Sequence, residues 1–143
     1  MSVAQVGGGH YAASYQHWDF VVEAFDNRYM EGQITKYVIR WREKNGVEDL
    51  RKARSYAAKT LEVYLAGLFD RPSCFRGVNF VRACIDKLFN GMGKDPRSEE
   101  GTIFFLAGTW QSADDLKKIV QLLDEMIERT EGAAATPAYV AQG

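Results

Sequence analysis

Residues 31–56, EGQITKYVIRWREKNGVEDLRKARSY, hold the clearest structural pattern in this 143-residue chain. Apolar side chains recur at helical spacing over 30–44 and again over 47–67, as expected for one buried stripe on each of two α-helices. Asn45 and Gly46 separate the two stripes, and glycine readily adopts the left-handed conformation in which helices end. The pattern predicts two helices joined by a short turn, an antiparallel helical hairpin.

Outside the hairpin the apolar period is also helical. A short helix is expected to begin near Trp18, another carries apolar residues from Val81 to Phe89, and the last follows Ser112, a candidate helix N-cap. The apolar run 103–107 fits either a helical turn or a buried strand. Because no alternating strand pattern is present, the sequence predicts an all-α fold, a compact bundle of five or six helices.

The length of the chain fits a single domain. We expect a flexible N-terminus over 1–9, one helical domain over 10–130 and a disordered tail over 131–143. The prediction for the tail rests on its low-complexity, alanine-rich composition. Within the domain, 10–68 contains the hairpin and 69–130 adds further helices.

Composition narrows the classes of function. The net charge of −1 gives no strong nucleic-acid signal, and no apolar run is long enough to span a membrane. Without a signal-peptide pattern, the chain is expected in the cytoplasm. Two cysteines and two histidines, not spaced as ligands, predict no metal site. Trp110, in an expected loop, belongs to a set of aromatic residues that we expect this small domain to leave partly uncovered, so a homo-oligomer is predicted.

Polar side chains follow one flank of each hairpin helix. On the first helix they recur every fourth residue: Gly32, Lys36, Arg40 and Lys44. On the second helix they recur at helical spacing: Asp49, Lys52, Tyr56 and Lys59. If the hairpin brings these flanks together, several cations converge with one carboxylate and one phenol.

Such a convergence suits a phosphate group. Arginine offers a planar fork of donors and lysine supplies a point charge. Aromatic neighbours such as Tyr37 and Trp41 could stack on a nucleobase. The competing interpretation is a solvated helical face in which these cations pair with nearby carboxylates such as Glu43 and Glu48, and spacing alone favours it.

The same residues carry a resemblance to a known family. The pattern HY, then G-x-x-x-K-Y-x-x-R-x-x-x-K, then D-L-x-K-A-x-x-Y resembles the phage SaV-like domain family of unknown function, which includes the T7-type phage nucleotide kinase. The resemblance covers roughly residues 10–65. It implies a ligand site at the matched positions: His10, Tyr11, Gly32, Lys36, Tyr37, Arg40, Lys44, Asp49, Lys52 and Tyr56.

The resemblance implies a bacteriophage protein that acts in the cytoplasm of an infected bacterium and binds a nucleotide. One alternative is a deoxynucleoside monophosphate kinase using ATP and Mg²⁺, with Asp49 as the catalytic carboxylate that holds magnesium or orients the acceptor. A second is a non-catalytic protein that sequesters a nucleotide and counters host defence. A third is an accessory protein that binds a host or phage partner through its C-terminal helices.

Overall fold

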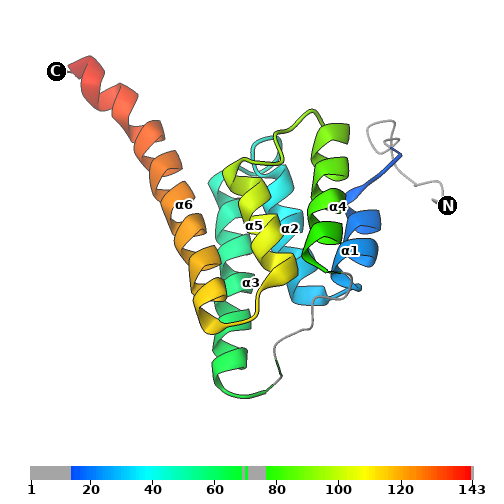
Figure 1. The fold of residues 1–143 in the computed structure, drawn as a ribbon. Helices are drawn as coiled ribbons and strands as arrows, with labels where there is room; N and C mark the ends of the chain where they lie inside the picture. The colour runs from blue at the N-terminus through cyan, green and yellow to red at the C-terminus, as the bar shows by residue number, and fades with distance from the viewer. Residues whose placement is uncertain (1–13, 69, 71–76, 143) are drawn as a thin grey trace.

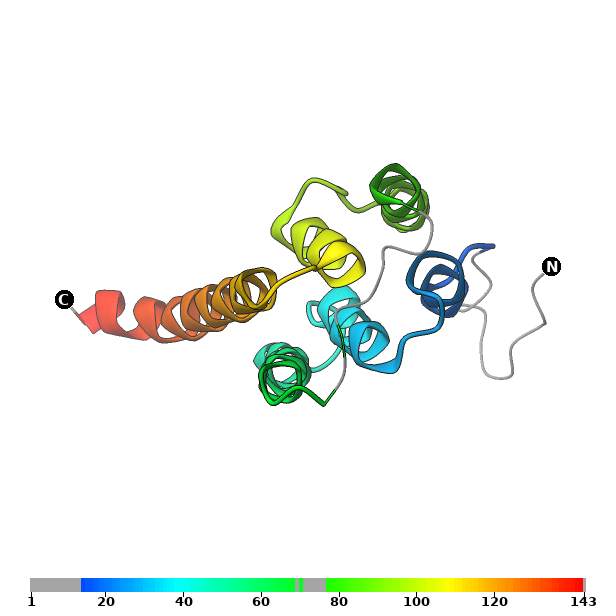
Figure 2. The ribbon, with the colours of Figure 1, turned by 60° about the horizontal axis from the view of Figure 1, so that its bottom comes forward.

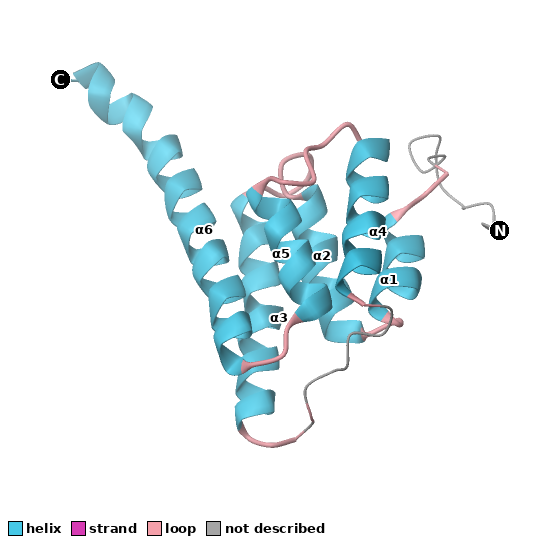
Figure 3. Cartoon of the chain, viewed as in Figure 1, coloured by secondary structure: helices cyan, strands magenta, loops and turns pink. Residues whose placement is uncertain are grey.

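The computed structural model describes residues 14–68, 70 and 77–142, and every regular element in them is an α-helix (Figures 1 and 3). The all-α prediction is therefore confirmed, with six helices in this part of the chain. None of these helices is both long and apolar enough to cross a membrane. In chain order the helices are α1 (His17–Phe25), α2 (Tyr29–Arg40), α3 (Val47–Leu65), α4 (Val78–Gly91), α5 (Glu99–Thr109) and α6 (Ala113–Gln142).

The six helices form two layers of three. Helices α1, α2 and α3 lie side by side in chain order, and α4, α5 and α6 form the opposite layer. Each helix of the first layer packs on the helix three places later, so α1 faces α4, α2 faces α5 and α3 faces α6. Figure 2 shows the two rows nearly end on. One side of the α2–α3 hairpin therefore packs against α5 and α6. The polar flank that the sequence predicts must lie on the remaining surface of the hairpin.

Aromatic side chains join the layers. Phe104 of α5 is fully buried, with its ring centroid 5.2 Å from that of Phe20 on α1 and 4.9 Å from that of Phe89 on α4. Phe20 in turn lies 4.8 Å from Phe25, edge to face. These tilted and edge-to-face contacts are the favoured geometries for aromatic rings and add to the hydrophobic burial.

The predicted hairpin is present, with a longer turn than expected. Helix α2 ends at Arg40, and turns over 41–46 lead into α3. Gly46 has φ +59° and donates its backbone N–H to the carbonyl of Trp41 at 2.8 Å. This left-handed geometry favours glycine, because a side chain there is strained.

The ambiguous run 103–107 is helical and lies inside α5. Ser98 caps this helix by accepting the backbone N–H of Gly101 at 3.2 Å, and Glu99 and Glu100 occupy the first turn, where acids favour the helix dipole. Because α5 packs on α2, α4 and α6, apolar residues surround much of it and hide the helical period.

Two expectations differ from the structure. The stretch 131–142 continues α6, which extends beyond the packed body (Figure 1), although a disordered tail was expected there. Its alanines favour a helix intrinsically. Trp110 is buried, 1% exposed, rather than lying in an open loop, so it cannot contribute to a self-association patch. Exposed apolar side chains occur elsewhere, at Trp18, Val22 and Tyr29 among others.

Candidate functional site

Three cations converge on one tyrosine ring. The guanidinium carbon of Arg40 lies 4.8 Å from the centroid of Tyr37, and the ammonium nitrogens of Lys36 and Lys52 lie 5.3 Å and 5.5 Å from it. All three distances are within the range of cation–π attraction. We call Lys36, Tyr37, Arg40, Lys52 and Tyr56 the Tyr37 face.

The hairpin builds this face. Lys36 and Arg40 lie one helical turn apart on α2, and α3 runs back beside α2 so that Lys52 reaches the same ring. Tyr56, one turn after Lys52, stacks on Tyr37 with a centroid distance of 6.1 Å and an interplanar angle of 12°. The flanks that the sequence placed on separate helices therefore meet.

The carboxylate behind this face is Asp49, which is fully buried. One of its oxygens accepts from Arg40 Nη2 at 3.4 Å and from Asn45 Nδ2 at 3.3 Å, and the other accepts the backbone N–H of Asn45 at 3.2 Å. Burial by itself raises the pKa of Asp49, but these hydrogen bonds and the charge of Arg40 lower it overall. Asp49 is therefore an ionised buried group that fixes Arg40 and the turn before α3.

Ion pairing divides the cations in the described part of the chain into two groups, and the two lysines of this face belong to the group without a carboxylate partner. Arg42, Arg51, Arg54, Lys59, Lys94, Arg97 and Arg129 each pair with a carboxylate. Within the same described residues, neither Lys36 nor Lys52 has a carboxylate partner. The Tyr37 face thus holds a local excess of positive charge, which is what an anion requires.

The other matched positions lie in different places. Gly32 is buried where α2 crosses α1, and a Cβ there would lie 3.2 Å from Val21 Cγ1, so glycine permits this close helix contact. Lys44 is exposed in the turn after α2, beyond the helix that carries Arg40. His10 and Tyr11 lie outside the described residues.

A pocket of about 440 Å³ opens beside the Tyr37 face, between α1 and α2. Gly32, Lys36 and His17 are among the residues that line it, and Nε2 of His17 lies 2.7 Å from Thr35 Oγ1. Burial, and secondarily the charge of Lys36, lower the pKa of His17 from 6.5 to about 4. His17 is therefore neutral at pH 7. Nothing in the sequence singles out His17, because its burial depends on contacts with Thr35 of α2 and Phe104 of α5.

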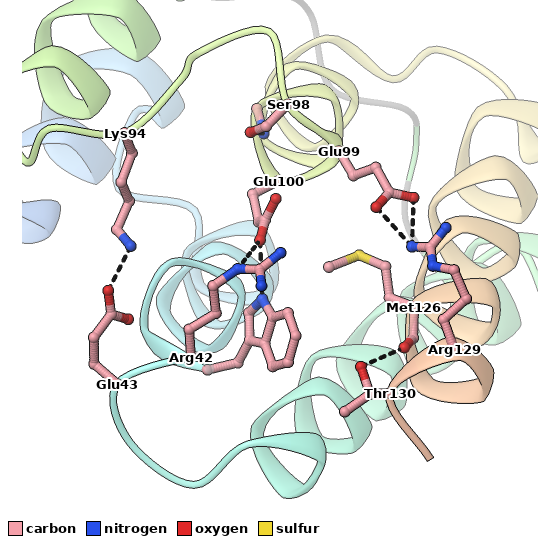
Figure 4. Close-up of polar contacts among 11 residues, drawn as sticks. Arg42, Glu43, Lys94, Ser98, Glu99, Glu100, Met126, Arg129 and Thr130 are labelled. Atoms are coloured by element: carbon pink, nitrogen blue, oxygen red, sulfur yellow. Dashed lines mark hydrogen bonds and ion pairs between the residues drawn. The ribbon is translucent and has the colours of Figure 1, made fainter. Parts of the chain in front are cut away.

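A second polar cluster lies just beyond the C-terminal end of α2. Glu100 of α5 accepts from Trp41 Nε1 at 3.0 Å and from Arg42 Nε at 3.1 Å, and Lys94 Nζ donates to Glu43 at 2.6 Å (Figure 4). We call these five residues the Glu100 network. Trp41 is 9% exposed and uses its only polar group here, so its ring is not available to stack on a base as the sequence suggested.

Comparison with known proteins finds a similarity to a family model but no activity. Residues 8–58 match the model of a family described as a protein of unknown function, DUF3310. The match confirms a resemblance to a family of unknown function in the N-terminal part of the chain, and it contains every residue of the Tyr37 face. No curated protein and no solved structure matches the chain.

Proposed function

We propose that this protein binds a nucleotide through its phosphate groups at the Tyr37 face. The observation that carries the proposal is the convergence of Lys36, Arg40 and Lys52 on one ring, with Asp49 as the single carboxylate that pairs with them among the described residues. A phosphate would supply the missing negative charge and accept several charge-assisted hydrogen bonds.

The geometry prepares Arg40 for such a ligand. One end of its guanidinium is held by the buried Asp49, and its side chain remains 32% exposed. An arginine fixed in this way loses less side-chain entropy when it binds a phosphate than a freely moving one does. Lys36 and Lys52, both exposed, can adjust around the anion as point charges.

Binding without phosphoryl transfer is the form of the proposal that the site supports best. A kinase that uses ATP and Mg²⁺ needs carboxylate or similar oxygens open to the metal. Both oxygens of Asp49 already accept N–H groups and the residue is fully buried. We therefore assign Asp49 the role of positioning Arg40, in place of the catalytic role expected from the sequence.

The resemblance to the SaV-like phage family supports a nucleotide, rather than another anion, as the ligand. In this proposal the protein is a bacteriophage product that sequesters a nucleotide in the cytoplasm of the infected cell, where such binding would counter a nucleotide-based host defence. Self-association remains a separate prediction, which light scattering at micromolar concentration tests.

Calorimetric titration with nucleoside mono-, di- and triphosphates tests the proposal. Lys52→Ala should weaken binding of the best ligand by about tenfold, since a charge-assisted hydrogen bond contributes about 1.5 kcal/mol or more. Lys117→Ala removes an equally exposed lysine from α6 and should leave affinity unchanged. Equal affinities for both variants and the wild type would contradict the proposal.

Two further measurements complete the design. Circular dichroism establishes that both variants remain folded, which is expected because Lys52 and Lys117 are exposed. Incubation of the wild type with ATP, Mg²⁺ and each deoxynucleoside monophosphate should give no diphosphate product. Turnover abolished by Lys52→Ala would instead establish the kinase alternative.

A further inference from the structure

We propose that the pocket between α1 and α2 receives the base of the bound nucleotide, so that the ligand spans from this pocket to the Tyr37 face. The inference rests on the proposed function, because it takes the phosphate position from it. It adds a second subsite, and it identifies a planar aromatic group as the part of the ligand that this subsite recognises.

The pocket and the Tyr37 face are continuous. Lys36 lines the pocket, and its ammonium nitrogen also lies 5.3 Å from the centroid of Tyr37. Tyr29 lines the pocket as well, and its ring meets that of Tyr56 edge to face at 6.1 Å. One molecule with a charged end and an uncharged end could therefore occupy both places.

The lining suits a planar aromatic group. Trp18, Val22 and Tyr29 are 50%, 61% and 64% exposed, and all three border this pocket. Large apolar side chains that gather at one opening are typical of a binding site. Tryptophan and tyrosine rings stack on bases of any identity, because every base has a π face.

Polar groups in the pocket can bind the edge of a base. Asn27 and Gln33 are among the residues that line it, and a side-chain amide supplies both donors and an acceptor. The lowered pKa keeps His17 uncharged at neutral pH. The volume of about 440 Å³ lies within the usual range for small-molecule sites. Apolar walls with a few convergent polar groups are typical of such sites.

The first experiment uses the wild-type protein with a nucleoside diphosphate and inorganic pyrophosphate, which is the same anion without base and sugar. Trp18 is half exposed, whereas Trp41 and Trp110 are buried, so acrylamide quenching of tryptophan fluorescence reports mainly on Trp18. The nucleoside diphosphate should protect Trp18 from acrylamide. Saturating pyrophosphate should bind and leave Trp18 accessible.

The second experiment measures affinity by calorimetry. Trp18→Ala should weaken binding of the nucleoside diphosphate by about fivefold to a hundredfold, the range for loss of one base stack, and leave pyrophosphate affinity unchanged. Met92→Ala removes an exposed apolar side chain outside the pocket, at the end of α4, and should change neither. Gln33→Leu provides a second variant of the pocket and should also weaken only the nucleoside diphosphate.

The outcomes separate the two proposals. If both ligands bind equally well, and neither Trp18→Ala nor quenching distinguishes them, the base subsite is wrong while phosphate binding at the Tyr37 face is supported. If neither ligand binds the wild type, the proposed function itself fails. If the nucleoside diphosphate alone protects Trp18 and alone loses affinity in both variants, the base lies in this pocket.

Discussion

The Tyr37 face spans α2 and α3, and the Glu100 network joins the turn after α2 to α5 and the loop before it. The two regions differ in how their positive charges are paired. In the Glu100 network each cation meets a carboxylate from the other layer, Arg42 with Glu100 and Lys94 with Glu43. In the Tyr37 face, Lys36 and Lys52 lie over an aromatic ring instead. Paired charges largely neutralise each other, whereas unpaired charges gathered in one place attract an anion.

The Tyr37 face and the Glu100 network also differ in their position in the sequence. The Tyr37 face lies wholly within the residues that match the DUF3310 family model, 8–58. The Glu100 network combines the turn after α2, which lies inside that region, with Lys94 and Glu100, which lie outside it. The comparison therefore predicts that changes in the Glu100 network alter stability, and that changes in the exposed part of the Tyr37 face alter ligand affinity.

Removing the buried acid of the hairpin should have the largest effect. Asp49→Ala leaves Arg40 without its carboxylate and the N–H groups of Asn45 without an acceptor. Loss of one partner from a buried ion pair costs about 3 kcal/mol of unfolding free energy. Urea denaturation measures this. Asp86→Ala, which breaks the exposed ion pair with Arg97, is the control and should cost less than about 1 kcal/mol.

If Asp49→Ala were as stable as the wild type, Asp49 would not support the hairpin. That result would instead favour the alternative in which Asp49 is a catalytic carboxylate.

Acid should destabilise the protein through His17. Its pKa is 6.5 unfolded and about 4 folded, so the unfolded chain binds the proton first as pH falls. The stabilisation is complete above pH 6.5 and is lost as pH falls toward 4, by about 3 kcal/mol in total. Urea midpoints at pH 7, 6 and 5 measure the loss, and His17→Gln should flatten the profile.

The loss of stability between pH 6.5 and 4 can be assigned to His17. The two carboxyl groups whose pKa is lowered lose their stabilisation only at more acidic pH. Asp49 and Glu100 have reference values of 3.8 and 4.5, and their stabilisation is lost only as pH falls below these. A bound phosphate beside Lys36 should raise the pKa of His17 and narrow the window. An identical profile for wild type and His17→Gln would contradict the assignment.

Breaking the Glu100 network should have a moderate effect on stability and none on phosphate binding. Glu100→Ala removes the acceptor of the Trp41 indole, and the side chain of Glu100 is only 13% exposed. A buried donor left unsatisfied costs about 1–3 kcal/mol. Chemical denaturation should give this loss, while Glu62→Ala, which breaks an exposed pair, should cost little. A weakened affinity for phosphate in Glu100→Ala would show that the two regions are coupled.

Changing the central ring should have the smallest effect. Tyr37→Leu removes the π surface that holds the three cations together, and an exposed cation–π contact contributes about 0.5–1 kcal/mol. Phosphate affinity should therefore fall by about twofold to fivefold. Tyr37→Phe keeps the ring and should behave as the wild type in the same calorimetric titration. An equal loss in both variants would assign the effect to the hydroxyl.

The candidate site was predictable in part because it is local. Lys36 and Arg40 lie one turn apart on α2, and a short turn returns the chain to Lys52, so helical spacing sufficed to bring them together. Spacing did not reveal that Asp49 would be enclosed, or that Lys44 would follow the end of α2. Both depend on where the turn falls, and helix boundaries are weakly encoded by sequence period.

The sequence by itself determined the helices and the hairpin, because apolar period and turn residues act over a few positions. Only the tertiary structure decided that Trp41 and Trp110 are buried, that Arg42 pairs with Glu100, and that an open pocket lies between α1 and α2. Each of these depends on packing between helices far apart in the chain. The two-layer arrangement, absent from any local pattern, selects which charges are neutralised and which remain for a ligand.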